Sequence, residues 1–328
     1  MIEMLIQRGG SVFDISQLVG NIEWSTDIDN SQAGKLKFDY QEDDSVIPEE
    51  GDFLRFRFNN QNVFLGRFFS RKRNSKRVMQ ITACDLVFYL LKNKHTYALK
   101  AATSAQIFTQ ICQDLARDIP QLSHRVVNAS SFNVPPKMHD NETLFDIIKD
   151  ALDLTLINRR EWFFIRDNFG ILEHINIDDL QTDLVIGDQS MATDFEFESS
   201  ISVDTYNQVR LVRENQETMR REVYIVRDSS NIRKWGRIQF HDTVDDNLNI
   251  RQIEARAKLI LEAKNRPTRK LKIPVLGDLR IRAGNGVVLN ITSLRGEGFG
   301  EFQRALVATC THKWSGSVHT MDLSMEVI

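Results

Sequence analysis

The sequence predicts a β-rich α+β fold in which two β domains flank a smaller mixed domain. Short alternating stretches separated by turn residues fill the first part of the chain and return in its last third. Two amphipathic helices lie between these β regions, and one long helix interrupts the second of them. We place the domains at residues 1–96, 97–185 and 186–328.

The first domain shows the period-two alternation that is typical of β-strands. Leu54, Phe56 and Phe58 alternate with residues that would point to the opposite face of a strand. Residues 59–62 are Asn-Asn-Gln-Asn, which favours a turn, and residues 63–65 begin the returning strand. Short strands at this spacing favour a barrel or a sandwich.

The middle domain is predicted to contain two helices and a hairpin. Thr103 and Gln106 fit a capping box ahead of an apolar stripe with helical spacing. A second stripe of the same kind covers residues 144–152. The hairpin covers residues 161–175 and turns at residues 167–170.

The third domain is again rich in β patterns. One strand is predicted around Val209 and another around Val223. A long helix begins near Ile250 and stops at residues 265–267, which include a proline. Strands then resume to the end of the sequence, and no period of 20 to 50 residues repeats cleanly along the chain.

Composition and charge exclude several classes of protein. With 41% hydrophobic and 27% charged residues, the 328-residue chain is neither disordered nor collagen-like. The formal net charge of -3 gives no general attraction to nucleic acid or to anionic membranes. No apolar run approaches the about 18 residues that a membrane span needs, and the start lacks the features of a signal peptide. We expect folding in a cytoplasm, no specific nucleic acid and no membrane insertion.

The residues that could carry chemistry form no recognisable catalytic pattern. Cys84, Cys112 and Cys310 lie far apart and include no CxxC pair, so we predict buried thiols in a reducing compartment. The sequence contains no GxSxG, SxxK or HExxH motif. We therefore expect no enzyme activity, no catalytic residue, no cofactor and no metal site.

The histidines and one glycine-rich segment have structural explanations. None of the seven histidines has ligand spacing from another, and His139 is interpreted as a surface or supporting residue. His312 and His319 are expected on an exposed sheet face. Residues 295–300 have the glycine content of a phosphate loop but lead into a β-type run at residues 305–311. A hairpin loop is therefore favoured over an anion site.

Two charged segments of the first domain form a candidate interface. The acidic loop covers residues 42–52, and the basic tip covers residues 71–77 between two strands. Solvated turns explain both segments, whereas docking to neighbours is the sharper alternative. Opposite charges in one domain suit head-to-tail neighbours, whose contacts close into rings. The candidate interface residues are Arg71, Lys72, Arg73, Lys76 and Arg77 on the tip, and Glu42, Asp43, Asp44, Glu49 and Glu50 in the loop.

A helix followed by a strand and a Gly-Asp-x-x-Ile-x-x-Gly turn at residues 277–284 gives the last third of the chain a recognisable order. This order resembles the baseplate hub proteins of contractile phage tails and PBSX-type prophages, and more distantly the type VI secretion spike proteins. Residues 22–26 resemble the opening hairpin of that family, residues 140–148 its inter-barrel helix and residues 312–323 its closing hairpin.

The resemblance covers nearly the whole chain, although each motif alone is weak. Ala283 stands where proline is expected and Asn285 where aspartate is commoner, and both still suit a turn. The resemblance implies two tube-like antiparallel β-barrel domains flanking a small α+β domain. It also implies a homotrimer whose pseudo-sixfold ring adapts the sixfold tail tube to the threefold central spike.

Further expectations follow from the same resemblance. The implied partners are the central spike protein and the tail tube or tube-initiator protein, with the tape-measure protein as a further candidate. The protein would lie in the bacterial host cytoplasm during assembly and then in the baseplate of a virion or tail-like particle. Two alternatives stay open: a tail-associated peptidoglycan hydrolase, and a host-receptor or carbohydrate-binding tail protein.

Overall fold

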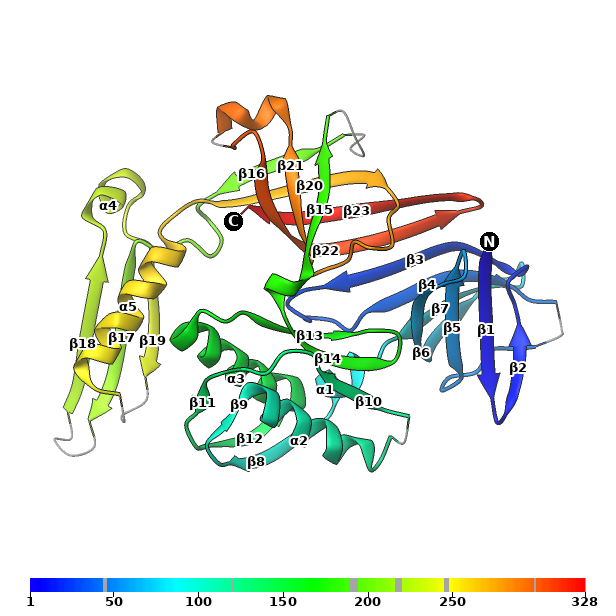
Figure 1. Ribbon diagram of the computed structural model, residues 1–328, viewed down its shortest axis with the longest axis horizontal. Coiled ribbons are helices and arrows are strands. Elements are labelled where there is room, and N and C mark those ends of the chain that lie inside the picture. Colours follow the sequence, from blue (N-terminus) through cyan, green and yellow to red (C-terminus); the bar gives the residue numbers. More distant parts are fainter. Residues whose placement is uncertain are drawn as a thin grey trace. The chain divides into compact units, whose positions relative to one another are not determined.

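The fold is β-rich and divides into two compact units (Figure 1). The first unit comprises Met1–Glu196 and Leu271–Ile328, and the second comprises Phe197–Lys270. The computed structural model describes residues 1–43, 46–119, 121–188, 194–215, 220–244, 248–297 and 299–327. The second unit is therefore an insertion within the sequence of the first, and each unit is described by itself.

One large sheet of thirteen strands dominates the first unit. In sheet order its strands are β16 (Glu196–Ser200), β20 (Thr268–Leu276), β23 (Val318–Val327), β22 (Gln303–Ser315), β3 (Val19–Asp27), β4 (Lys35–Gln41), β7 (Val78–Cys84), β6 (Gln61–Arg73), β5 (Phe53–Phe58), β1 (Ile2–Arg8) and β2 (Ser11–Asp14). The remaining two are β21 (Gly286–Asn290), which pairs with β22, and β15 (Gln181–Gly187), which pairs with β21 in parallel. Among the described strands no pairing joins the two ends of this order, so closed barrels stay a prediction.

The sheet has two lobes that meet where β3 pairs with β22. Strands β1 to β7 form the N-lobe, and β15 and β20 to β23 form the C-lobe. Figure 1 shows β3 beside β22 at this junction. In their register Trp24 lies opposite His312 and Ile22 opposite Trp314. Trp314 packs into the N-lobe core, where aromatic and aliphatic side chains fill the interior because strands present alternate residues inward. Strands from the two ends of the chain thus share one core.

The middle region of the chain is the mixed segment that the sequence predicts. Its helices are α1 (Val87–Lys92), α2 (Ser104–Ala116), α3 (Leu144–Arg159) and the 3-10 turn η1 (Ile177–Leu180). Its strand sets are β8 (Lys94–Leu99) with β12 (Lys137–Thr143), β9 (Ala102–Thr103) with β11 (Asn133–Val134), and β10 (Ser123–Val126) with β14 (Ile171–Asn176) and β13 (Phe163–Asp167). Their shared core includes Phe108, Ile111 and Ile147.

Local predictions for this region are confirmed. The Thr103 side chain accepts the Gln106 N–H, and the Gln106 side chain accepts the Thr103 N–H, which completes the capping box of α2. The predicted hairpin is the antiparallel pair β13–β14, in which Asp167 lies opposite Leu172. Of residues 295–300, Gly298 lies outside the described residues, and residues 295–297 belong to the 3-10 turn η2 (Thr292–Glu297) between β21 and β22.

The second unit has two layers. Its sheet has β17 (Gln208–Asn215) at the centre, β18 (Arg220–Arg227) antiparallel on one side and β19 (Gln239–Val244) parallel on the other. The helix α4 (Ser229–Trp235) follows β18, and α5 (Ile250–Lys264) packs Ile253 and Ala257 against Val209 and Leu211. This long helix, expected from the sequence, covers a sheet of its own because β17 offers it an apolar face. The domain bounds 1–96, 97–185 and 186–328 stay a prediction.

No helix in the described ranges is both long and apolar enough to span a membrane.

Candidate functional site

The acidic loop and the basic tip lie against each other within one chain. Arg73 Nε donates to Glu42 Oε2 at 2.9 Å, and Arg77 Nη2 lies 3.5 Å from Glu42 Oε1. Arg71 Nη1 donates to the Pro48 carbonyl oxygen at 2.6 Å. The Glu42 side chain is 5% exposed, so its pairing with Arg73 satisfies a carboxylate that burial would otherwise penalise. The turn between β6 and β7 places the tip over the loop, and Arg77 has a positive φ of 61° there.

Arg8 on β1 is a further partner of the acidic loop, and it lies outside the basic run. Its guanidinium contacts Asp52 Oδ2 at 2.6 Å and Glu49 Oε1 at 3.0 Å. Burial would raise the pKa of Asp52, but hydrogen bonds from Arg8 and from the Glu49 N–H hold that pKa below its usual range. A single arginine in a strand pattern carries no signal of this contact, which depends on β1 pairing with β5.

These contacts change the reason for expecting a docking partner. Because Arg71, Arg73 and Arg77 already face loop oxygens, self-repulsion at the tip is largely offset within the chain. Lys72 and Lys76 are exposed and make no ion pair with any residue that the structure describes. Docking of the tip onto an acidic surface stays a prediction, now centred on these two lysines.

The other members of the candidate interface are less informative. Glu50 Oε1 lies 3.5 Å from Arg71 Nε at the exposed rim of the loop. Asp43 is exposed, and Asp44 lies outside the described residues. The structure therefore brings most of the predicted charges together at one corner of the N-lobe, as ion pairs rather than as a pocket.

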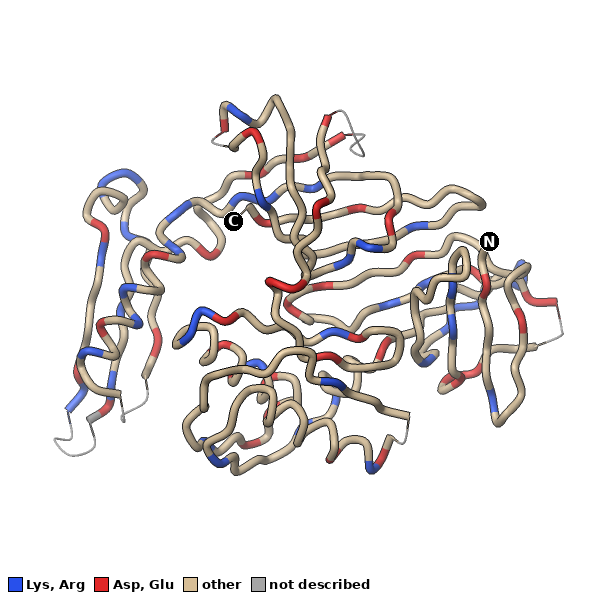
Figure 2. Tube along the Cα trace, in the orientation of Figure 1, with Lys and Arg blue, Asp and Glu red and all other residues tan. Residues whose placement is uncertain are grey.

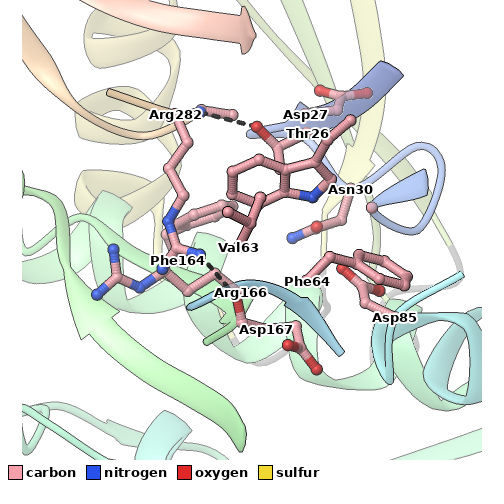
Figure 3. Close-up of a pocket in the computed structure, with 13 residues that line it drawn as sticks. Thr26, Asp27, Asn30, Val63, Phe64, Asp85, Phe164, Arg166, Asp167 and Arg282 are labelled. Carbon is pink, nitrogen blue, oxygen red and sulfur yellow. Dashed lines mark hydrogen bonds between the residues drawn. The ribbon is translucent and has the colours of Figure 1, made fainter. Parts of the chain in front are cut away.

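A second group of charges is buried where β7, the β13–β14 hairpin and the turn before β21 meet (Figure 3). Arg282 extends down into this cluster, and its Nη1 donates to the Asp167 carbonyl oxygen at 3.1 Å (Figure 3). The Asp167 carboxylate accepts N–H groups from Leu86 at 3.3 Å and Gly170 at 2.8 Å. Asp85 Oδ1 accepts the Val87 N–H at 3.0 Å. Three distant segments of the chain are thus tied through one polar cluster.

The electrostatics of this cluster follow from its burial. Burial, with the neighbouring Asp167 as a second cause, raises the pKa of Asp85 well above its usual value. Burial also raises the pKa of Asp167 to about 6 and lowers the pKa of Arg282 to about 10. The cavity among these side chains has a volume of about 20 Å³. A cavity of this size has room for a water molecule but not for a larger ligand. The cluster therefore links segments of the chain and does not form a binding pocket.

Glu173 on β14 extends this network next to Arg282. Its carboxylate is fully buried and accepts Arg166 Nε at 2.8 Å and Asn168 Nδ2 at 3.0 Å, and it also pairs with Arg125. Burial would raise the pKa of Glu173, but these donors hold it below the usual range. The hairpin turn therefore carries a compensated buried charge, which a turn motif in the sequence does not reveal.

The prediction that His312 lies on an exposed sheet face is wrong. His312 is buried, its Nδ1 lies 3.0 Å from His319 Nε2, and its Nε2 lies 2.8 Å from the Ile281 carbonyl oxygen. The Trp24 ring stacks on it with ring centroids 5.2 Å apart. The face is covered at this point by the Trp24 ring and by the turn that carries Ile281, and burial lowers the pKa of His312 to about 4.

The predictions for the three cysteines and for His139 as a supporting residue are confirmed. Cys84, Cys112 and Cys310 are buried free thiols, and burial raises the pKa of Cys84 to about 11. His139 is buried and its Nδ1 lies 3.0 Å from Glu142 Oε2, which fits a supporting residue. Within the described ranges, no group of three or more His, Cys, Asp or Glu is placed to hold a metal ion.

Comparison with known proteins agrees with this architecture. The phage-like element PBSX protein XkdQ of Bacillus subtilis strain 168 is 26% identical over 277 residues, which cover 84% of this chain and 81% of XkdQ. The 43 kDa tail protein of prophage MuSo2 from Shewanella oneidensis has a similar fold, with a TM-score of 0.73 and 12% identity. That likeness covers 99% of this chain and 98% of the tail protein.

A type VI secretion protein shares the fold more distantly. The E. coli c3393 protein has a TM-score of 0.56 and 10% identity, covering 94% of this chain and 73% of its own. It is described as a component of that system with structural similarity to the T4 tail proteins gp27 and gp5. A family model described as YQBQ-like matches residues 22–326. This chain therefore belongs to the YQBQ-like family and shares its fold with phage tail proteins.

Proposed function

We propose that this protein is the structural hub in the baseplate of a phage-like contractile tail. The observation that carries the proposal is the likeness in fold to a prophage tail protein over nearly the full length of both chains. A relative from the PBSX phage-like element supports the same setting. The chain would assemble in the host cytoplasm and then stay in the baseplate of the particle.

Three copies of the chain would form the hub ring. Each copy contributes an N-lobe and a C-lobe, both built mainly from antiparallel strands and joined at β3 and β22. Three copies therefore supply six lobes, which suits a ring between a sixfold tail tube and a threefold spike. The described likeness of the E. coli relative to gp27 and gp5 supports this arrangement. The partners would be the central spike, the tube or its initiator, and the tape-measure protein.

We also propose a role without catalysis. The buried cluster of Asp85, Asp167 and Arg282 directs its polar atoms to backbone groups of neighbouring segments, and its cavity is the size of a water molecule. A peptidoglycan hydrolase would instead need an acid and a base facing a cleft that admits a sugar chain. Hydrolysis of peptidoglycan that survives repurification, and is lost on a single substitution, would contradict this role.

The mass of the full-length chain in solution tests the hub proposal most directly. Sedimentation velocity over a range of concentrations should approach three times the chain mass of 37.9 kDa. Reconstruction of the assembled tail should place three copies around the axis. Six identical copies in the ring, or a single copy on the axis, would overturn the proposal.

A further inference from the structure

One face of the sheet in the second unit is left open. The helix α5 covers the face that carries Val209 and Leu211. Because side chains alternate along a strand, Arg210 and Val212 point to the opposite face. In the register of β17 with β18, Ile225 lies opposite Arg210 and Val223 lies opposite Val212. Val212 itself is 1% exposed, so the exposed part of this face lies on β18 and around Arg210. We call the face formed by Arg210, Val223, Ile225 and Arg227 the open face.

The open face combines exposed aliphatic groups with arginines. Val223 is 42% exposed and Ile225 is 53% exposed on the same side of one strand. Arg227 at the end of β18 is exposed. Arg210 Nε is buried, and among the residues that the structure describes it has no hydrogen-bond partner. Adjacent exposed aliphatics and an unsatisfied buried donor are both unusual on a free surface, so this face fits a partner that brings apolar and acidic groups.

The first unit carries a surface of that chemistry. Residues 167–209 contain no Lys or Arg, although the chain has 42 of them. Four aspartates on η1, on β15 and directly after β15 are exposed and pair with no Lys or Arg among the described residues: Asp178, Asp179, Asp183 and Asp188. Val185 lies among them and is 39% exposed. We call Asp178, Asp179, Asp183, Val185 and Asp188 the acidic stretch.

The overall charges of the two units reinforce this complementarity (Figure 2). The second unit, residues 197–270, has fifteen Lys and Arg against eleven Asp and Glu, so it is net positive. The whole chain has 42 against 45, so the rest of the chain carries the excess of acid. A basic unit and an acidic unit in the same chain attract each other when two copies meet.

We propose that the open face is a contact surface between copies of this chain and binds the acidic stretch of a neighbouring copy. Val223 and Ile225 would form the apolar centre against Val185, and Arg210 and Arg227 would meet the aspartates around it. Since the two surfaces differ, each copy uses its own open face and offers its acidic stretch to the next, which closes into a ring. This inference rests on the proposed trimeric hub and specifies which surfaces hold it together.

Substitution at the centre of the open face provides the first test. The full-length double variant Val223→Glu with Ile225→Glu should raise the dissociation constant of the assembly about tenfold or more, since central apolar contacts dominate interfaces. Ile250→Glu is the matched control, because Ile250 is 52% exposed in the same unit but begins α5 on the covered side. Sedimentation velocity gives the constants, and circular dichroism with thermal melting shows whether each variant is folded.

A charge swap identifies the partner surface. Arg227→Asp alone and Asp183→Arg alone should each weaken assembly at low salt, because each places like charges together. The two changes in one chain should recover part of the lost affinity, since the pair is restored with reversed polarity. The assignment is overturned if the double variant shows only the sum of the two single losses in affinity, and if arginine at each other aspartate of the acidic stretch also fails to restore affinity to Arg227→Asp.

The outcomes separate this inference from the hub proposal. A trimeric wild type whose double variant keeps the wild-type dissociation constant would overturn the inference and leave the hub intact. A wild type that stays monomeric at every concentration would overturn both the trimer and this contact. A trimeric wild type, a dissociated double variant and an unaffected Ile250→Glu control would support the contact.

Discussion

The two units of this chain are held together in different ways. The first unit ties distant segments through buried charges, with Arg282 from one end of the chain reaching the backbone at Asp167. The second unit relies on local structure: Asp228 caps α4 and accepts Asn265 Nδ2 at 2.8 Å, and α5 covers an apolar sheet face. Buried charges are stable only when their segments keep one arrangement, whereas the exposed apolar area of an open face can still be buried by a partner. We therefore expect the first unit to be the harder of the two to open, and the proposed contact leaves the open face of the second unit free to meet the acidic stretch of a neighbouring copy.

Arg282→Ala should give the largest difference in stability between the two units, because it acts on the first unit alone. It leaves Asp85 and Asp167 without a neighbouring cation, and breaking such a buried network costs about 3–5 kcal/mol. Hydrogen exchange should show faster opening in the first unit and unchanged protection in β17 and α5. Arg280→Ala is the control, because Arg280 pairs with Asp278 at the exposed surface of the same turn. Equal protection in the Arg282→Ala variant and the wild type would mean that the cluster does not hold the segments.

The buried histidine at the lobe junction should make the first unit sensitive to acid. The pKa of His312 is about 4 in the folded state against the ordinary 6.5 of a histidine, so the unfolded chain binds the extra proton. Its contribution is present above pH 6.5 and is lost as the pH falls toward 4, by about 2 kcal/mol between pH 7 and pH 5. Chemical denaturation at both pH values should show a smaller pH effect in His312→Gln. An identical pH effect in both proteins would contradict this role.

Asp167 should act in the opposite direction and with a smaller magnitude. Its folded pKa of about 6 lies above the ordinary 3.8, so the folded state binds the extra proton. Its contribution is fully present below pH 3.8 and is lost as the pH rises through 6, by about 1 kcal/mol between pH 5 and pH 7. In Asp167→Asn the gain in stability from pH 5 to pH 7 should therefore exceed that of the wild type. A smaller gain in the same denaturation experiment would show that the carboxylate stays charged in the fold.

The exposed lysines of the basic tip should give the smallest effect. Lys72→Ser with Lys76→Ser should slow ring or baseplate assembly at low salt and leave the rate unchanged at high salt, because rim charges act mainly on encounter. Changing Arg71, Arg73 and Arg77 to Ser together also breaks their contacts with the acidic loop, so the lysine pair is the cleaner test. Assembly at the wild-type rate across all salt concentrations would make the tip a solvated turn.

Local signals in the sequence predicted much of the fold. The capping box at Thr103, the hairpin over residues 161–175 and the helix that ends at Asn265 are all present, because each depends on neighbouring residues. The sequence did not predict the burial of His312, which depends on β3 pairing with β22 from the other end of the chain. The absence of Lys and Arg from residues 167–209 was readable in the sequence but gained meaning only beside the open face.

The sequence also did not predict the buried cluster of Asp85, Asp167 and Arg282. Asp85 and Arg282 are single charges in turn segments, and neither has a neighbour in sequence that predicts a partner. Their proximity depends on three segments that converge only in the folded chain. The contacts within the acidic loop and the basic tip were partly predictable as a pair of opposite charges, but their intrachain geometry follows from the β6–β7 hairpin.

The pairing of β3 with β22 has a consequence for biosynthesis. The strand Val19–Asp27 leaves the ribosome well before its partner Gln303–Ser315, because the whole middle of the chain lies between them. Until then one edge of β3 is an unpaired template, and the indole of Trp24 lacks the His312 ring that covers it. Such distant pairings form slowly and expose the nascent chain to association with other chains. Productive yield in the host should therefore depend on how quickly the segment from β3 to β22 is synthesised, and on chaperones that shield this edge in the interval.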